Sequence, residues 1–191
     1  MGLMSMAGPA DNRGITGVPS HFRIRTRFLP KDMGYVLQST EDDFVYDVVD
    51  ADVRIEINGR TPFLPGSYRL SDDGYLRSIP VIDFAWNLVV ACKHLSNSNP
   101  STERVTVTST HYELEFERQN DSVQLRVLEG GRAGKVIAAT SLTLIELQRE
   151  CKSVGELELA GIFRDNPALR GNPHLKRFAS EIAMLERAIK Q

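Results

Sequence analysis

The sequence contains little of what several specialised classes of protein require. Its 191 residues include two cysteines and four histidines, and no apolar run approaches the roughly 20 residues that cross a bilayer. No HExxH, CxxC, GxSxG or P-loop motif is present, and the histidines lie on separate segments. These absences argue against a membrane span, a zinc site and a nucleotide-binding loop. We therefore expect neither a metal nor a cofactor.

The two cysteines are too few, in a chain this long, for the disulfide framework of a small secreted domain. Cys92 and Cys151 fall within predicted helices, which favours two free, buried thiols. The N-terminal stretch "MGLMSMAGPADNRG" has no basic region before an apolar one, so the pattern does not indicate a secretory signal. We expect the protein in the cytoplasm.

The charge is nearly balanced overall but unevenly distributed. A net charge of −2 argues against a nucleic-acid binder, which usually carries a basic excess. Residues 38–83 contain ten acidic side chains against four arginines, whereas residues 1–37 carry a net charge of +3. Acidic segments can steer basic partners toward a protein, although they also serve solubility. The acidic loops that we single out contain Asp42, Asp43, Asp72 and Asp73.

The periodicity of apolar residues predicts an α+β fold. Residues 1–20 lack periodicity and are predicted to form a disordered tail, and residues 21–191 to form a single domain. Alternating apolar residues predict strands at residues 22–28 and 53–57, then a four-strand meander at about 104–109, 111–118, 122–128 and 135–140. Helical spacing predicts one helix at 78–97 and two C-terminal ones. We expect an antiparallel sheet packed on one face by about three helices, while residues 33–75 stay ambiguous.

Capping residues predict where the helices begin. Ser78 is expected to cap the first helix, in which Trp86 would be a core anchor. Thr143 and Glu146 form a capping-box pattern before the second helix. Asn172 followed by Pro173 predicts the start of the third. Gly155 lies inside the second predicted helix, where a break or bend is possible.

The stretch "HYELEFER" divides its side chains between two faces of a predicted strand. Its apolar residues point toward the core, and the other face carries His111, Glu113, Glu115 and Glu117. Alternate residues lie about 6.8 Å apart on one face of a strand, a separation known from glycosidase carboxylates. An open face leaves carboxylates in water, however, and does not raise a pKa as acid catalysis requires. The remaining interpretations are a solvated face or a binding surface.

The segments "YELEFERQNDSVQLRV" and "FRDNPALRGNP", with the order of the elements around them, carry a resemblance. Over about residues 100–191 the chain resembles the small cytoplasmic immunity proteins of bacterial polymorphic-toxin systems. The resemblance implies a non-enzymatic protein that binds and neutralises a cognate toxin, with no catalytic residues to carry over. We then expect a protein partner with a basic surface to contact the strand face and the acidic loops.

Two other functions remain open at this stage. An enzyme would require a concave pocket between the sheet and the helices, with polar groups that converge on it. An adaptor or structural subunit would expose a wide apolar patch, for which Leu157, Leu159, Ile162 and Phe163 are the candidates.

Overall fold

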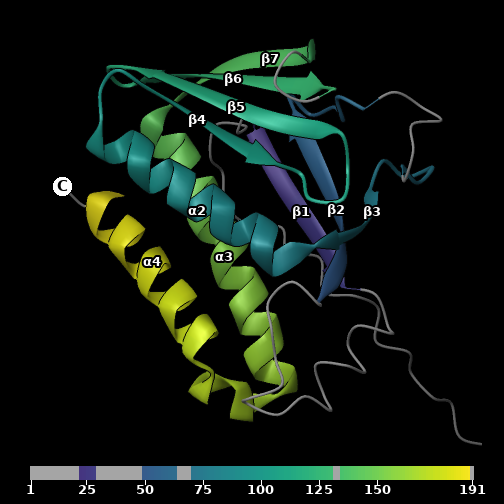
Figure 1. Ribbon diagram of the computed structural model, residues 1–191, viewed down its shortest axis with the longest axis vertical. Helices are drawn as coiled ribbons and strands as arrows, with labels where there is room; N and C mark the ends of the chain where they lie inside the picture. The colour runs from purple at the N-terminus through teal and green to yellow at the C-terminus, as the bar shows by residue number, and fades with distance from the viewer. Residues whose placement is uncertain (1–21, 29–48, 64–69, 131–133, 190–191) are drawn as a thin grey trace, which may run out of the picture.

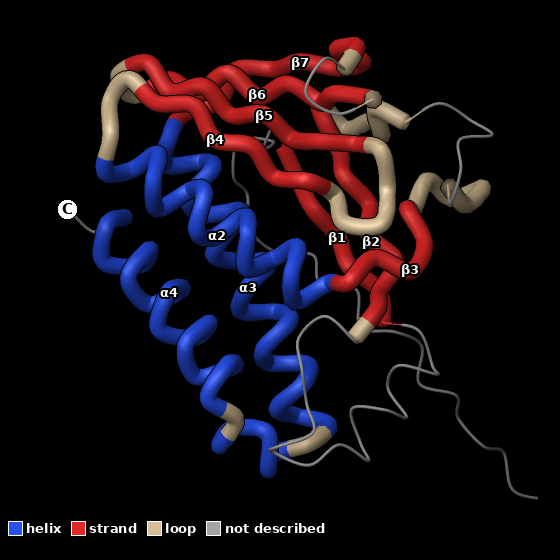
Figure 2. The backbone as a smooth tube through the Cα atoms, viewed as in Figure 1, coloured by secondary structure: helices blue, strands red, loops and turns tan. Residues whose placement is uncertain are grey.

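The computed structural model describes residues 22–28, 49–63, 70–130 and 134–189, which form two antiparallel sheets and a layer of helices (Figures 1 and 2). The three-stranded sheet has the order β1 (Phe22–Phe28), β2 (Asp50–Ile57) and β3 (Leu76–Pro80). The four-stranded sheet has the order β4 (Ser101–Thr106), β5 (Tyr112–Gln119), β6 (Ser122–Glu129) and β7 (Lys135–Thr143). The helices are α2 (Val81–Asn97), α3 (Leu144–Asp165) and α4 (Pro173–Ile189), with the short 3-10 helix η2 (Pro167–Gly171) before α4. The predicted α+β fold with an antiparallel sheet is confirmed.

The helices lie side by side on one side of the four-stranded sheet. Figure 1 shows α4 as the outermost helix, with α2 and α3 between it and the strands. Helix α3 also runs along β1, which is an edge strand of the smaller sheet. No helix of the described residues lies over the opposite face of the four-stranded sheet.

The first two strands form as their alternating residues predict. Ile24 and Ile55 are paired and buried, whereas the arginines between the apolar residues of β1 point outward. Asn58 and Gly59 follow β2 with φ angles of 52° and 76°, the positive values that this type of tight turn requires. The turn is closed by two backbone hydrogen bonds between Ile57 and Arg60, of 2.8 and 3.1 Å.

The predicted meander is confirmed, with each of its strands paired antiparallel to the next along the chain. Its inner face carries fully buried side chains such as Leu114, Phe116 and Leu125. Phe116 meets Phe22 of β1 edge-to-face, with ring centroids 6.2 Å apart, so aromatic packing joins the two sheets. The buried apolar residues of both sheets and the helices form one cluster.

The predicted start of the first helix is wrong. Ser78 lies within β3 with a φ angle of 52°, and α2 begins only after Pro80, without a side-chain cap. The reason is tertiary: Ile79 pairs with Ala51 of β2 and is fully buried, so the chain stays extended up to Pro80. Trp86 is half-buried at the edge of the core, where it stacks on Phe178 of α4 at a centroid distance of 5.3 Å.

The two C-terminal helices begin where their caps predict. Thr143 and Glu146 form the complete capping box of α3, and the Asn172 side chain accepts hydrogen bonds from two backbone N–H groups at the start of α4. Helix α3 continues through Gly155 without a break. A Cβ at Gly155 would lie 2.7 Å from Ile182 Cδ1, so the absence of a side chain lets α4 approach α3 closely.

Some predictions lie outside the described residues. These are the tail at residues 1–20, the aspartates Asp42 and Asp43, and most of the ambiguous segment before β2. Within that segment, residues 50–57 are strand β2, and Asp72 and Asp73 lie between Leu70 and β3.

Candidate functional site

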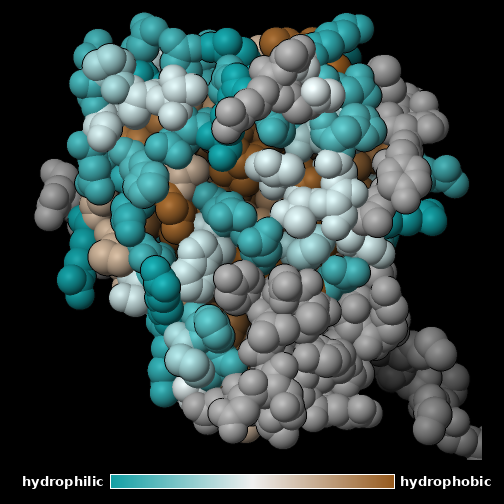
Figure 3. Space-filling view, in the orientation of Figure 1, coloured by the Kyte–Doolittle hydropathy of each residue, from teal (hydrophilic) through white to brown (hydrophobic). Residues whose placement is uncertain are grey.

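The predicted strand face lies on the outer side of the four-stranded sheet, away from the helices. The register places Glu115 of β5 directly between Arg104 on β4 and Arg126 on β6, with Glu113 and Glu117 two residues to either side of Glu115 on the same face. Figure 3 shows mostly hydrophilic surface over this upper part of the molecule, with hydrophobic atoms along the top edge where β7 lies. The outer face is therefore polar, but it alternates acidic and basic side chains across the strands.

The expectation that an open sheet face leaves Glu113 and Glu115 in water is wrong for Glu115. This residue is 6% exposed, because the arginines on the two neighbouring strands fold over it. Arg104 Nε donates to Glu115 Oε2 at 2.6 Å, and Arg126 Nη1 lies 3.2 Å from Glu115 Oε1. Glu115 therefore serves as the centre of an ion-pair ladder and is not available to a basic partner.

The other predicted residues of this face remain accessible to different degrees. Glu117 is half-buried and pairs with Arg126, and Glu113 Oε2 lies 3.8 Å from Arg104 Nη1. His111, just before β5, is exposed, and its Nε2 lies 3.2 Å from Glu129 Oε1. Three glutamates against two arginines leave one net negative charge on the outer side of β4–β6. The face is much less acidic than the sequence of β5 alone suggests.

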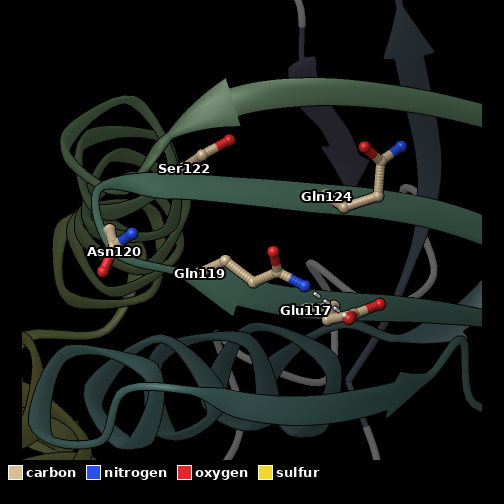
Figure 4. Close-up of a pocket in the computed structure, with 5 residues that line it drawn as sticks. All are labelled: Glu117, Gln119, Asn120, Ser122 and Gln124. Atoms are coloured by element: carbon tan, nitrogen blue, oxygen red, sulfur yellow. Dashed lines mark hydrogen bonds between the residues drawn. The ribbon is translucent and has the colours of Figure 1, made fainter.

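A polar hollow of about 330 Å³ opens at one end of this face (Figure 4). Glu117 and Gln119 reach it from β5, Ser122 and Gln124 from β6, and Asn120 from the turn between them. Gln119 Nε2 donates to Glu117 Oε1 at 3.1 Å, and Gln124 Oε1 accepts from the Ser141 hydroxyl of β7. The hollow presents hydrogen-bonding groups of both kinds and no large apolar side chain.

The acidic loop that contains Asp72 and Asp73 lies beside the other sheet. Arg27 bridges two carboxylates there, with Nη1 3.0 Å from Asp73 Oδ2 and Nη2 2.9 Å from Asp52 Oδ2. A hydrogen bond from the Ser71 hydroxyl, and then Arg27, hold the pKa of Asp73 below its usual range. Asp72 and Asp73 line a second hollow together with Arg27. None of the β5 glutamates lines this second hollow, so the structure does not join the two predicted acidic regions into one site.

A further cluster of polar groups lies between α3 and β1. Because β1 is an edge strand, backbone groups on its outer side need other partners. The Ile24 N–H donates to Glu150 Oε1 of α3 at 2.6 Å, and burial raises the pKa of this glutamate. Helix α3 therefore closes the edge of the smaller sheet with a carboxylate.

Two turns further along α3, Glu158 is more deeply buried than Glu150. It is 1% exposed, its Oε1 accepts a hydrogen bond from the Thr26 hydroxyl, and its Oε2 is buried with no hydrogen-bond partner in the part of the chain that the structure describes. Burial raises the pKa of Glu158 from 4.5 to about 7, against the opposing effect of the Thr26 hydrogen bond. A carboxyl group in this condition can hold or release a proton near neutrality, which is common at functional sites.

Glu158 also lines a cavity of about 400 Å³ between β1 and α3. Ile24, Phe28 and Leu157 supply apolar walls, and Arg25 and Arg164 contribute charged groups. The volume is in the range of small-molecule sites, and apolar walls with a few polar groups are typical of them. The cavity lies between sheet and helix, where the enzyme alternative expects a pocket.

The apolar patch expected of an adaptor is not formed. Leu157 is 64% exposed, but Leu159 and Ile162 are buried and Phe163 packs against the core. These four residues wind around α3, so helical geometry turns half of them inward.

Comparisons with known protein families, with curated proteins and with solved structures find no match for the chain. Among the helices of the described residues, none is both long and apolar enough to span a membrane. In the same part of the chain, no three His, Cys, Asp or Glu side chains gather where they could hold a metal ion.

Sequence reasoning missed Glu158, although a signal was present. Cys151, Val154 and Ile162 mark the buried stripe of α3, and Glu158 falls four residues after Val154 and four before Ile162. A charged residue inside an apolar stripe predicts a buried carboxylate. Its partner Thr26 was not predictable from α3 alone, since it comes from a strand 132 residues earlier in the chain.

Proposed function

We propose that this chain is a non-enzymatic protein-binding domain that works as an immunity or inhibitor protein against a cognate bacterial toxin. The observation that supports the proposal best is the free outer face of the four-stranded sheet. The helices pack against the other face, and no helix or strand of the described residues covers the outer side chains of β4–β7. A sheet face with a polar hollow at one end provides a broad surface with many hydrogen-bonding groups.

The charge pattern of the sheet face indicates the surface chemistry expected of the partner. Because Glu115 is neutralised by two arginines, the face offers only one net negative charge to a basic toxin surface. Hydrogen bonds from Gln119, Asn120 and Gln124 would supply specificity, and Glu117 would meet a partner's Arg or Lys at the rim of the hollow. Asp72 and Asp73, on their separate loop, would add long-range attraction and a second contact.

The two cysteines agree with a cytoplasmic role for such a protein. Cys92 and Cys151 are both free and buried. Thiols stay reduced in the cytoplasm, where an immunity protein meets a toxin before it is secreted or after it enters a cell.

The test places positive charge in the hollow. The double variant Ser122→Arg/Gln124→Arg introduces two cations where a basic partner would dock, and neither wild-type residue belongs to an ion pair in the described part of the chain. Co-expression with the product of the neighbouring gene should show protection from toxicity by the wild-type protein and its loss in the variant. Titration calorimetry with the purified pair should show affinity lower by about tenfold or more.

The matched control reverses a charge elsewhere. Glu156→Lys alters the exposed side of α3, away from the sheet face, and should leave protection and affinity unchanged. Glu115 is unsuitable as a test position. Its replacement would remove an ion-pair partner from two arginines and destabilise the sheet. If the neighbouring product is harmless, or if Ser122→Arg/Gln124→Arg still protects fully, the proposal fails.

A further inference from the structure

Glu158, which lines the cavity between β1 and α3, carries a buried polar atom that the described part of the fold leaves unsatisfied. Glu158 is 1% exposed, and its Oε2 has no hydrogen-bond partner among the described residues, whereas Oε1 is engaged by Thr26. A buried acceptor without a donor is costly, and an ionised one more so. A glutamine would accept the Thr26 hydrogen bond equally well, so the fold itself does not require a carboxylate here.

The two arginines that also line the cavity do not compensate this carboxylate. Arg25 Nε lies 3.3 Å from Glu56 Oε2, and Arg164 Nε lies 2.9 Å from Asp165 Oδ1. Both side chains are more than half exposed and are directed to these surface partners. Within the described residues, no ion pair joins Glu158 to a basic side chain, so the cavity has a place for a cation from outside.

The apolar side chains that line the rest of the cavity indicate what kind of ligand would fit it. Ile24, Phe28, Val154 and Leu157 line the cavity with apolar surface, and Leu157, 64% exposed, belongs to both the cavity wall and the protein surface. A Cβ at Gly161 would lie 3.3 Å from the Phe28 ring, so the bare glycine backbone keeps the helix close to this ring. An apolar or aromatic group would fill such a space and leave its polar end to Glu158.

From these observations we infer that the cavity between β1 and α3 binds a small organic amine, with its ammonium group on Glu158 and an apolar body against Phe28 and Leu157. An ammonium group offers both the missing hydrogen-bond donor and the missing positive charge, and charge-assisted hydrogen bonds are the stronger ones. This site is separate from the sheet face, and the inference does not depend on the proposed toxin partner.

A matched pair of probes tests the inference on the intact protein. Phenethylamine and 2-phenylethanol share the ring and the two-carbon chain, and differ in the ammonium group. Amide chemical shifts in ¹⁵N–¹H NMR spectra should change at Thr26, Leu157 and Gly161, which line the cavity. At about pH 8 the amine should bind about tenfold more tightly than the alcohol, as expected for one charge-assisted hydrogen bond.

Two variants and one control test whether the binding of the probes, and the preference for the amine, depend on Glu158 and the cavity. Glu158→Gln keeps an acceptor for Thr26 and should abolish the preference for the amine, whereas Glu156→Gln, on the exposed side of α3, should retain it. Gly161→Leu should weaken both probes, because its side chain would push against Phe28 and narrow the cavity. Equal affinities for the two probes in the wild-type protein, an amine preference that survives Glu158→Gln, or shift changes away from the cavity would each overturn the inference.

Discussion

At the scale of single residues, Glu158 is a side chain whose charge state couples strongly to folding. Burial raises its pKa from 4.5 to about 7, so between these values the folded protein holds a proton that the unfolded chain releases. A raised pKa in the folded state stabilises the protein fully below about pH 4.5, and the stabilisation is lost as the pH rises to about 7. The full loss corresponds to about 3 kcal/mol.

The variant Glu158→Gln should remove this dependence. It cannot ionise, so at about pH 8 it should be more stable than the wild-type protein by up to about 3 kcal/mol, and nearly equal to it at about pH 4. Urea unfolding of both proteins across this range measures the difference.

Comparison with the wild-type protein is essential, because Glu150 also has a raised pKa and contributes in the same direction. The difference between the two proteins cancels that contribution. A stability difference that does not change with pH would show that Glu158 is not a buried, protonated carboxyl group near neutrality.

At the scale of elements, the cap of α4 determines how the last helix is attached. Asn172 is 1% exposed, and its Oδ1 accepts hydrogen bonds from the backbone N–H groups of His174 and Leu175, at 2.9 and 3.1 Å. The helix then buries a single apolar stripe formed by Leu175, Phe178, Ile182 and Leu185. The cap thus lies next to the first buried residue of the stripe, where an unpaired N–H group would be costly.

Replacing Asn172 with alanine should therefore destabilise the protein by about 1–2 kcal/mol. The control Asn172→Asp keeps a hydrogen-bond acceptor and adds a negative charge at a helix N-terminus, so it should lose little stability. Urea midpoints measure the effect, and amide hydrogen exchange should show faster opening in α4 than in the sheets. Equal midpoints for alanine and aspartate would mean that packing alone holds this end of the helix.

At the scale of the whole molecule, one buried cluster connects both sheets and the helices. Cys92 of α2 and Cys151 of α3 lie within it, and each is 1% exposed. A hydrogen bond between the two thiols, together with burial, raises the pKa of Cys151 well above its usual range. Because the thiolate is the reactive form, modification of these cysteines requires opening of the helix layer.

A thiol reagent such as Ellman's reagent should label the native protein much more slowly than the urea-unfolded chain. The matched control is Glu156→Cys in a background without the two native cysteines, which places an exposed thiol on the same helix and should react at once. If the native cysteines reacted as fast as this surface thiol, α2 and α3 would have to separate without global unfolding.

Local sequence patterns were sufficient to predict those structural features that depend on residues close together in the chain. The Thr143–Glu146 capping box and the Asn172 cap each involve groups within a few residues, so the sequence predicts them correctly. The sequence also predicts the meander, because each strand alternates in polarity and pairs with the next strand along the chain.

Contacts between distant segments decided the rest. Pairing with β2 kept Ser78 in a strand, and arginines from two neighbouring strands converted the expected acidic face into an ion-pair ladder around Glu115. The sequence by itself determined most of the elements, the caps of α3 and α4, and the division of each strand into a buried and an outer face. Only the tertiary structure decided which charges remain free and where a carboxylate is buried, because charge compensation and desolvation depend on partners far away in the chain.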